Sequence, residues 1–297
     1  MCLPAHQINF ESVNLTPPSL QMEIQNFLRE ILYVIVLHER RLKESESFLS
    51  LCAMGDNVPA RSIFIYDNSK EPAAGLDGKI VYRHDPGNPG VSRAYNQALT
   101  VAIEQKKKWM LLFDQDTAFT DNFLRKLYAS TRSNPESIAF VPVLKDSKGI
   151  VSPFRWAMGR GWRISHRLEI LNLKKFRFAN SGLLVQCDAF STVGGYEEAI
   201  PLDFSDVVFG EKLRQVTTSF TVVDAVLNHD FFGASINSTE ETLKRFRLFC
   251  TGGFEYARSI GVWISYVSIL WRAIHLSLSL KSLAFIRIFL ANCRRSS

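Results

Sequence analysis

The chain has 297 residues, of which 46% are hydrophobic and 22% are charged, a balance that excludes wholesale disorder. This length supplies enough material for the core of one large domain or two small ones. The net charge of +6 suits anionic partners such as nucleotides, polyphosphates or an acidic membrane surface. Five cysteines without a C-x-x-C pair argue against a disulfide framework and a zinc site.

Short apolar runs alternate with helical patterns over the first half of the chain. The predicted elements, in chain order, are a strand at 31–37, a helix at 39–55 that ends at Gly55, strands at 61–69 and 79–85, a helix at 91–105 and a strand at 106–116. This alternation is typical of a doubly wound α/β domain. Ligands of such domains bind beyond the carboxyl ends of the strands.

The strand at 106–116 ends in LLFDQDT, with Asp114 and Asp116 two positions apart. If both residues continue strand geometry, their carboxylates point to the same side and repel each other. Three interpretations are open. In the first, the strand end simply leads into a helix, with Thr117, Thr120 or Asp121 as its N-cap. In the second, the two carboxylates bind a divalent cation that phosphate oxygens also bind. In the third, they form an acid/base pair, which needs a separation of roughly 5 Å or more.

A second acidic turn and a glycine-containing loop accompany this pair. Asp67 ends the strand at 61–69, so both acidic turns face the same crevice of the predicted sheet. The loop HDPGNPGVSRAYN at 84–96 lies between them in sequence, and its glycines allow close backbone approach to a ligand. Because neither G-x-G-x-x-G nor G-x-x-x-x-G-K-[ST] occurs there, the loop predicts neither a dinucleotide site nor a P-loop.

The segment beyond about residue 240 is strongly apolar but contains interspersed basic side chains. Its longest uncharged stretch, 259–271, has 13 residues, fewer than the roughly 20 that a spanning helix needs. We expect two amphipathic helices that lie in a membrane interface, with Trp263 and Trp271 as interfacial rings. The alternative is that these helices pack on the rest of the chain or on a second subunit. The basic side chains are Arg258, Arg272, His275, Lys281 and Arg287.

Five segments, taken together in this order, resemble glycosyltransferase family 2, and in particular its bacterial rhamnosyltransferase-like members, which build surface polysaccharides. The segments are IFIYDNS, NPGVSRAYNQAL, LLFDQDT, NSGLLVQCDAFSTVGGYEE, and PLDFSDVVF followed by LNHD. The resemblance covers about residues 31 to 235. It implies an α/β GT-A fold, a Rossmann-like mixed sheet flanked by helices, as the catalytic domain at 31–238. An N-terminal extension at 1–30 precedes this domain and the amphipathic segment at 239–297 follows it.

The resemblance also implies which residues bind the donor, a nucleoside-diphosphate sugar of the dTDP or UDP type. Asp67 matches the acidic residue that hydrogen-bonds the nucleotide base, a role that suits a carboxylate accepting from an imide N–H. Asn88, Gly90 and Asn96 match positions that shape the nucleotide pocket. Asp114 matches the first aspartate of the family's D-x-D motif, which also touches the ribose and the diphosphate.

A divalent cation, Mn²⁺ or Mg²⁺, is implied by the same motif. Asp114 and Asp116 match its ligands, so that the cation and its phosphates offset the repulsion between the two carboxylates. His229 matches a histidine that in some relatives adds a further metal ligand. A structural role for this histidine stays open beside the ligand role.

The catalytic base is expected in PLDFSDVVF, where Asp206 is the first candidate and Asp203 the second. The acceptor hydroxyl would attack the anomeric carbon while the nucleoside diphosphate leaves from the opposite face. In the commoner family pattern an acidic residue follows two positions later, but Val208 stands there in this chain. That departure leaves room for an alternative, a non-catalytic sugar-nucleotide-binding or membrane-docking subunit of a polysaccharide assembly complex.

The remaining partners follow from the resemblance and the basic tail. We expect a glycan or glycolipid acceptor, with rhamnose as one candidate donor sugar, and a peripheral position on the cytoplasmic face of the cell membrane. The amino terminus has no basic segment followed by an apolar core, so no secretory signal is expected. A homodimer is compatible with this chain, whereas nucleic-acid binding is not expected, because the basic residues are scattered outside any recognisable module.

Overall fold

A nine-stranded mixed sheet forms the centre of the protein in the computed structural model, which describes residues 17–76, 78–228 and 238–295. The strand order is β3-β2-β1-β4-β11-β5-β12-β9, with β6 paired to β5. The bounds are β1 Ile31–Leu37, β2 Ile63–Asp67, β3 Val81–His84, β4 Trp109–Asp114, β5 Ala139–Asp146, β6 Gly149–Ser152, β9 Ile170–Asn172, β11 Leu183–Gln186 and β12 Ser219–Asn228.

Strands β1 to β4 are mutually parallel, and β11 runs antiparallel between β4 and β5. Because β12 pairs in parallel with β5, the carboxyl ends of β1 to β5 and of β12 meet at one edge of the sheet. This mixed arrangement confirms the predicted GT-A architecture. The four strands predicted in the first half are present within their predicted ranges.

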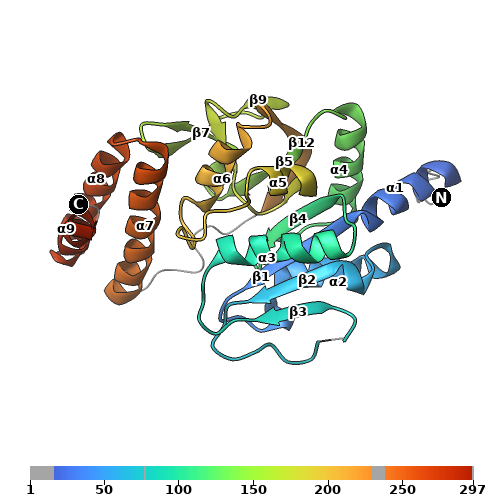
Figure 1. The fold of residues 1–297 in the computed structure, drawn as a ribbon, viewed down its shortest axis with the longest axis horizontal. Helices are drawn as coiled ribbons and strands as arrows, with labels where there is room; N and C mark the ends of the chain where they lie inside the picture. The colour runs from blue at the N-terminus through green and yellow to red at the C-terminus, as the bar shows by residue number, and fades with distance from the viewer. Residues whose placement is uncertain (1–16, 77, 229–237, 296–297) are drawn as a thin grey trace, which may run out of the picture.

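Helices cover both faces of the sheet (Figure 1). On one face α1, α2 and α4 pack their apolar side chains against β1, β2 and β4, and on the other face α3, α5 and α6 do so. The helices are α1 Pro18–Arg29, α2 Glu46–Ala53, α3 Val91–Glu104, α4 Asp121–Ser133, α5 Cys187–Thr192 and α6 Ser205–Leu213, and three short 3₁₀ turns are η1 Leu42–Glu44, η2 Gly55–Asn57 and η3 Ala60–Ser62.

Two predicted segments of the first half differ from the structure. The helix expected at 39–55 is divided into η1 and α2, because Ser45 accepts a hydrogen bond from the backbone N–H of Phe48 and starts a new helix there. Gly55, with a φ of 52°, directly follows Met54, the C-cap of α2, so the helix ends there as predicted; Gly55 also begins η2. Within the predicted N-terminal extension, α1 packs into the core of the domain through Phe27 and Leu28.

A second, three-stranded sheet with the order β10-β7-β8 lies beside the main sheet. Its strands are β7 Phe154–Ala157, β8 Arg160–Arg163 and β10 Phe176–Arg177. The β7–β8 hairpin turns through Met158 and Gly159, whose φ angles are 56° and 71°. Two successive residues with positive φ are the geometry of a tight hairpin turn.

Three helices complete the described chain, one more than the two that were expected there. They are α7 Thr239–Ile260, α8 Ile264–Ser279 and α9 Ala284–Arg295. Gly261, with a φ of 72°, ends α7, and a further turn separates α8 from α9. The helices form a bundle at the end of the molecule remote from α1 (Figure 1), with a core that includes Phe246, Phe254 and Phe285.

The first helix of this bundle also packs on the α/β domain that precedes it. Tyr256 of α7 lies in an apolar cluster with Ile200, Phe204, Val207 and Val208. The alternative of packing on the domain therefore holds for α7, although α8 keeps an exposed apolar face. None of the helices in the described ranges combines the length and apolar character needed to cross a membrane.

Candidate active site

Asp67 and Asp114 lie on either side of the last residues of β1, the strand between β2 and β4. In the parallel register Leu37 pairs with Asp67, and Val36 pairs with Asp114. Two of the sequence-predicted carboxylates thus meet at the carboxyl edge of the sheet, where ligands of open α/β folds bind.

Asp67 is 1% exposed, and its carboxylate is held by its own loop. It accepts hydrogen bonds from the backbone N–H groups of Ser69 (2.9 Å) and Ala73 (3.0 Å) and from the Tyr82 hydroxyl (2.7 Å). Burial alone would raise the pKa of Asp67, but these hydrogen bonds outweigh it and hold the pKa below its ordinary value. Asp67 is therefore an anion that orders the loop, and its contact with a nucleotide base stays a prediction.

The DQDT turn after β4 is fixed by serines of the α2 segment. Ser47 donates to the carbonyl oxygens of Asp114 and Thr117, the latter at 2.9 Å, and Ser45 donates to the carbonyl oxygen of Gln115 at 3.0 Å. Both serine side chains are fully buried. These bonds hold the backbone between the two aspartates, so that the carboxylates are presented from a rigid turn.

The donor set of this turn fits a hard divalent cation. Asp114 and Asp116 offer carboxylate oxygens, the ligands that Mg²⁺ and Mn²⁺ prefer. The described residues include no cluster of three or more His, Cys, Asp or Glu side chains that could hold a metal by itself. A cation at this turn would therefore need ligands from elsewhere, such as diphosphate oxygens. The predicted ligand His229 lies outside the described residues.

The NPG loop contacts the segment that leads to the candidate base. Gly90 has a φ of 92°, and a Cβ placed on it would lie 2.1 Å from the carbonyl oxygen of Pro201. Val91 donates its backbone N–H to the same carbonyl at 2.8 Å. Only glycine fits this close approach, so Gly90 connects the predicted nucleotide loop to the 201–206 loop. Asn88, with a φ of 47°, is exposed.

Asn96 also connects two segments of the protein. Its amide nitrogen donates to the carbonyl oxygen of Tyr196 (3.0 Å) and to Glu198 (3.1 Å), and its amide oxygen accepts from the backbone N–H of Tyr196 (2.8 Å). Asn96 thus ties α3 to the GGYEE turn. The predicted effect of Asn96 on a nucleotide pocket would therefore be indirect, through this turn.

Asn180 and Ser181 of the NSG segment have a structural role that was not predicted from the sequence. The Asp114 backbone N–H donates to Ser181 Oγ at 3.1 Å, and Ser181 Oγ lies 2.6 Å from Thr117 Oγ1. Asn180 accepts from the hydroxyl of Tyr196 at 2.7 Å. The NSG segment therefore supports the D-x-D turn on one side and the GGYEE turn on the other, and the adjacent small polar residues were the available signal.

Asp206 lies in the first turn of α6 and is close enough to Asp114 and Asp203 to feel their charges. Burial of its carboxylate and the two neighbouring charges raise its pKa to about 7. The backbone N–H of Val207 donates a hydrogen bond to Oδ1 at 2.7 Å, which lowers the pKa but does not outweigh the other effects. A carboxylate that titrates near neutral pH is suited to general-base chemistry.

The residue before α6, Phe204, has a φ of 73°, which is rare for a bulky side chain. Its ring is held in this conformation by rings of β7 and α7, with centroid distances of 6.0 Å to Trp156, 5.1 Å to Phe249 and 5.7 Å to Tyr256. Strained backbone of this kind persists only where its surroundings fix it, and it is often found at active sites. Strand β7 and helix α7 thus shape the loop that carries the candidate base.

The two candidate bases have different environments. Arg245 of α7 donates to Asp203 at 2.9 Å, whereas no basic side chain of the described ranges forms an ion pair with Asp206. Val208, which occupies the position of the commoner family acid, is 2% exposed and packs inward. The geometry therefore favours Asp206 over Asp203, and an acid at position 208 would point into the apolar cluster.

A groove of about 1010 Å³ opens beside these two aspartates. One wall is the β7–β8 hairpin, and the other is formed by α8 together with Phe249 of α7. Asp203 and Asp206 line its inner part, and Trp162 and Trp271 line its outer part with exposed fractions of 45% and 65%. A ligand in this groove could therefore contact the candidate base, Asp206.

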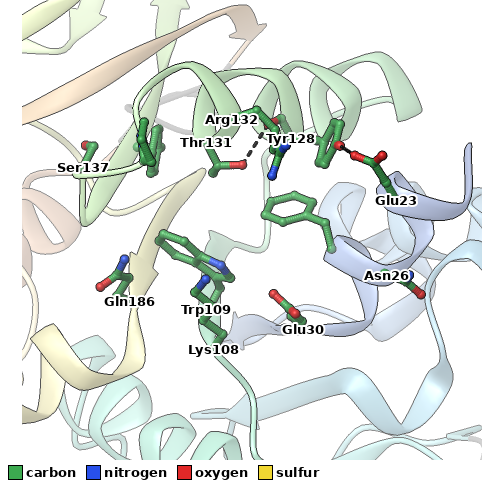
Figure 2. A pocket seen from close by; sticks show the side chains of 13 residues that line it. Glu23, Asn26, Glu30, Lys108, Trp109, Tyr128, Thr131, Arg132, Ser137 and Gln186 are labelled. Atoms are coloured by element: carbon green, nitrogen blue, oxygen red, sulfur yellow. Dashed lines mark hydrogen bonds between the residues drawn. The ribbon is translucent and has the colours of Figure 1, made fainter. Parts of the chain in front are cut away.

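A smaller cavity of about 380 Å³ lies at the opposite edge of the sheet (Figure 2). Figure 2 shows Tyr128, hydrogen-bonded to Glu23, and Arg132 on one side of it, with Glu30 and Trp109 across from them. Trp109 begins β4 and Asp114 ends it, so at about 3.3 Å per residue the two sites are roughly 17 Å apart. The cavity is therefore not part of the aspartate site.

Comparison with known proteins supports this fold. The family described as glycosyl transferase family 2 matches residues 50–192, which include the D-x-D turn and the NPG loop but not Asp203 or Asp206. None of the curated proteins is significantly similar to the sequence.

Solved structures resemble the chain at low sequence identity. The mannosyltransferase PcManGT from Pyrobaculum calidifontis, in complex with GDP-Man and Mn²⁺, is 14% identical with a TM-score of 0.50 over 90% of this chain and 76% of that one. Residues 1–349 of S. aureus TarS are 12% identical with a TM-score of 0.45 over 75% of this chain. The TarS complex with UDP-GlcNAc is 14% identical with a TM-score of 0.43, also over 75% of this chain.

The chain spans 65% of the TarS 1–349 structure. At 14% identity the PcManGT structure bears on the fold alone. The family match, which runs from α2 to the end of α5, bears on the family. Residues 50–192, which contain the D-x-D turn, thus match glycosyltransferase family 2, and the mixed sheet around them has the GT-A arrangement.

Proposed function

We propose that the protein is an inverting glycosyltransferase that moves a sugar from a nucleoside-diphosphate sugar to a hydroxyl of a lipid-linked saccharide acceptor. The observation that carries this proposal is the position of Asp206. Its carboxylate has a pKa near 7, lines a groove of about 1010 Å³ and feels the charge of Asp114 in the D-x-D turn. A base and a donor site on the same edge of the sheet are what the reaction requires.

On the donor side, Asp114 and Asp116 would hold a divalent cation together with the diphosphate. The cation, when bound, supplies Lewis-acid stabilisation of the leaving diphosphate. The ordered Asp67 loop and the NPG loop flank this turn and would enclose the nucleoside, of the UDP or dTDP type. PcManGT, which has a similar fold, was solved with GDP-Man and Mn²⁺, and TarS was solved with UDP-GlcNAc.

On the acceptor side, Asp206 would accept the proton of the attacking hydroxyl. The hydroxyl oxygen forms a bond to the anomeric carbon, the bond from that carbon to the phosphate oxygen breaks, and its electron pair leaves with the nucleoside diphosphate. Attack from the face opposite the leaving group inverts the anomeric configuration. Asp203, which is paired with Arg245, would hold the 201–206 loop in place.

The acceptor and the location complete the proposal. The exposed apolar face of α8 and the basic residues around it support a peripheral position on the cytoplasmic face of the membrane, where a lipid-linked acceptor for a surface polysaccharide would be presented. Rhamnose is the first donor sugar to test, on the strength of the sequence resemblance. The alternative of a non-catalytic subunit predicts nucleotide binding without turnover.

The donor assignment is tested by calorimetric titration of UDP, dTDP and GDP with Mn²⁺ or with a chelator. One nucleotide should bind in the presence of Mn²⁺, and both the chelator and Asp116→Asn should weaken it by about tenfold or more, since a charge-assisted contact is lost. Asp121→Asn is the matched control, because Asp121 pairs with Arg125 on the surface of α4. Equal binding by the Asp116 variant and the wild type would refute the assignment.

A further inference from the structure

A pair of adjacent polar residues, Asn180 and Ser181, contacts both the D-x-D turn and the first turn of α6, which carries Asp206. Ser181 faces the D-x-D turn, where its Oγ accepts the backbone N–H of Asp114 at 3.1 Å. Asn180 faces α6, where its side-chain amide N–H donates to Ser205 Oγ at 3.2 Å. The base and the donor turn are therefore connected through two neighbouring residues of one segment.

This segment is anchored in the sheet and buried. Gly182, the next residue, donates its backbone N–H to the carbonyl oxygen of Leu112 in β4 at 2.7 Å. The exposed fractions are 8% for Asn180 and 1% for both Ser181 and Ser205. A buried polar group that loses its partner is costly, so the hydrogen bonds from Asn180 and to Ser181 resist rearrangement.

Tyr196 fixes the orientation of the Asn180 amide. Its hydroxyl donates to the amide oxygen of Asn180 at 2.7 Å, which leaves the amide N–H groups facing Ser205. The Tyr196 ring also stacks on Phe209, one turn further along α6, with centroids 4.2 Å apart and an interplanar angle of 10°. Asn180 and Tyr196 thus hold two successive turns of α6.

A second buried contact leads from Tyr196 back to the D-x-D turn. The ring of Tyr95 in α3 lies 5.0 Å from that of Tyr196, and its hydroxyl donates to the carboxylate of Asp114 at 3.3 Å. Burial raises the pKa of both phenols well above its ordinary value, so both tyrosines stay neutral donors. The path from Asp114 to α6 therefore passes through buried side chains that keep one protonation state.

The supports that α7 gives to the same loop are of another kind. Arg245 pairs with Asp203 at 2.9 Å, and Phe249 packs on the ring of Phe204. These contacts fix the loop to the C-terminal helices. The contact from Asn180 instead fixes the first turn of α6 to the segment that also supports the donor turn.

From this arrangement we infer that Asn180 is a positioning residue, which holds Asp206 in place relative to the D-x-D turn through its hydrogen bond to Ser205. The inference rests on the proposed transferase function and adds the residue that aligns the base with the donor. A displacement of about 1 Å between reacting groups can lower a rate by about 10²-fold, so this alignment affects turnover more than donor binding.

Turnover and nucleotide binding, measured side by side, test the inference. We expect Asn180→Ala and Ser205→Ala each to lower kcat roughly 10- to 10²-fold, while calorimetry shows that Mn²⁺-dependent nucleotide binding is retained. The assay is nucleotide release from the UDP-, dTDP- or GDP-sugar that the wild type uses. The double variant should lose no more than Asn180→Ala alone, because both substitutions remove the same hydrogen bond.

Ser62→Ala is the matched control for Ser205→Ala. Ser62 is likewise buried, with 0% exposed, and its Oγ accepts a hydrogen bond from the side chain of Lys107 at 2.7 Å. It precedes β2 at the opposite edge of the sheet from the aspartates. We expect wild-type kcat in this variant at a temperature where circular dichroism shows every variant to be folded.

A stability measurement tests the same inference without any donor. In chelator, Asp206→Asn should raise the unfolding free energy more at pH 8 than at pH 5, because the buried carboxylate resists ionisation. In the Asn180→Ala background this difference between the two pH values should shrink, since a carboxylate that is no longer held in place can reach water. In the Ser62→Ala background it should stay as in the wild type.

Three outcomes would overturn the inference. They are additive losses of kcat in the double variant, nucleotide binding that weakens as much as kcat falls, and an undiminished pH difference in the Asn180→Ala background. A wild type that releases nucleotide from none of the donors would instead refute the proposed function. The stability measurement would then still decide whether Asn180 holds Asp206.

Discussion

At the scale of single residues, the environment of Asp206 determines a pH dependence. Burial and the neighbouring carboxylates raise its pKa to about 7, and a base must be deprotonated before it can accept a proton. We therefore expect kcat/KM to rise as the pH increases through about 7 and then to level off. Asp206→Asn should lower kcat by roughly 10²–10⁴ and should remove this rise while nucleotide binding is retained. A variant that loses nucleotide binding but stays folded would contradict the role.

The same carboxylate affects stability, and the sign follows from its raised pKa. In the folded protein Asp206 keeps its proton up to about pH 7, whereas in the unfolded chain it ionises near 4. The free energy of unfolding therefore decreases as the pH rises from about 4 to about 7, because the folded protein must hold a proton that the unfolded chain has released. Thermal unfolding in chelator should show Asp206→Asn to be more stable than the wild type at pH 8, with a smaller difference at pH 5. A difference that does not change with pH would contradict this view.

At the scale of elements, α7 is built into the active-site region. A Cβ on Gly252 would lie 2.1 Å from the carbonyl oxygen of Asp203, so α7 packs against the 201–206 loop through a bare backbone position. We expect Gly252→Ala to cost about 1–3 kcal/mol in unfolding free energy, measured in urea, and to reduce turnover because the loop must move. Thr251→Ala, at the neighbouring exposed position, is the control. Wild-type turnover in the Gly252 variant would show that the contact does not position the loop.

Several elements could be predicted because their signal is local. The strands at 31–37 and 109–114 are short apolar runs, and the register that brings Asp67 and Asp114 to one edge follows from the parallel order. The support of Phe204 by α7 could not be predicted, because its partners are more than forty residues distant in sequence. The hydrogen bonds of Ser47 to the D-x-D turn were equally hidden, since a lone serine in a helical segment has no pattern.

At the scale of the whole molecule, the groove extends from Asp206 to α8. An exposed apolar stripe runs along α8 and includes Trp263, Val267, Trp271 and Leu278. We expect the protein to bind vesicles that contain phosphatidylglycerol more tightly than vesicles of phosphatidylcholine alone. Trp263→Ser combined with Leu278→Ser should weaken this binding by about tenfold or more, because each side chain contributes about 1.5–3 kcal/mol when buried in lipid.

Cosedimentation with vesicles measures this effect, and Ile103→Ser is the control because Ile103 is also exposed, at 58%, but lies on α3. Point substitutions are preferable to truncation, since removal of α7 would also expose Phe204 and Val208. Equal loss in the control and in the α8 variant would mean that the stripe has no special part in membrane binding.

The central claim is that a metal-dependent donor site and the base Asp206 act together in sugar transfer. The most direct test is nucleotide release by the purified protein from a panel of UDP-, dTDP- and GDP-sugars that includes dTDP-rhamnose, supplied with farnesyl-diphosphate-linked N-acetylglucosamine as a lipid-linked acceptor, with Mn²⁺ or with chelator. We predict release from one donor that requires Mn²⁺ and is lost in both Asp116→Asn and Asp206→Asn. Release that persists in chelator or in both variants would contradict the claim.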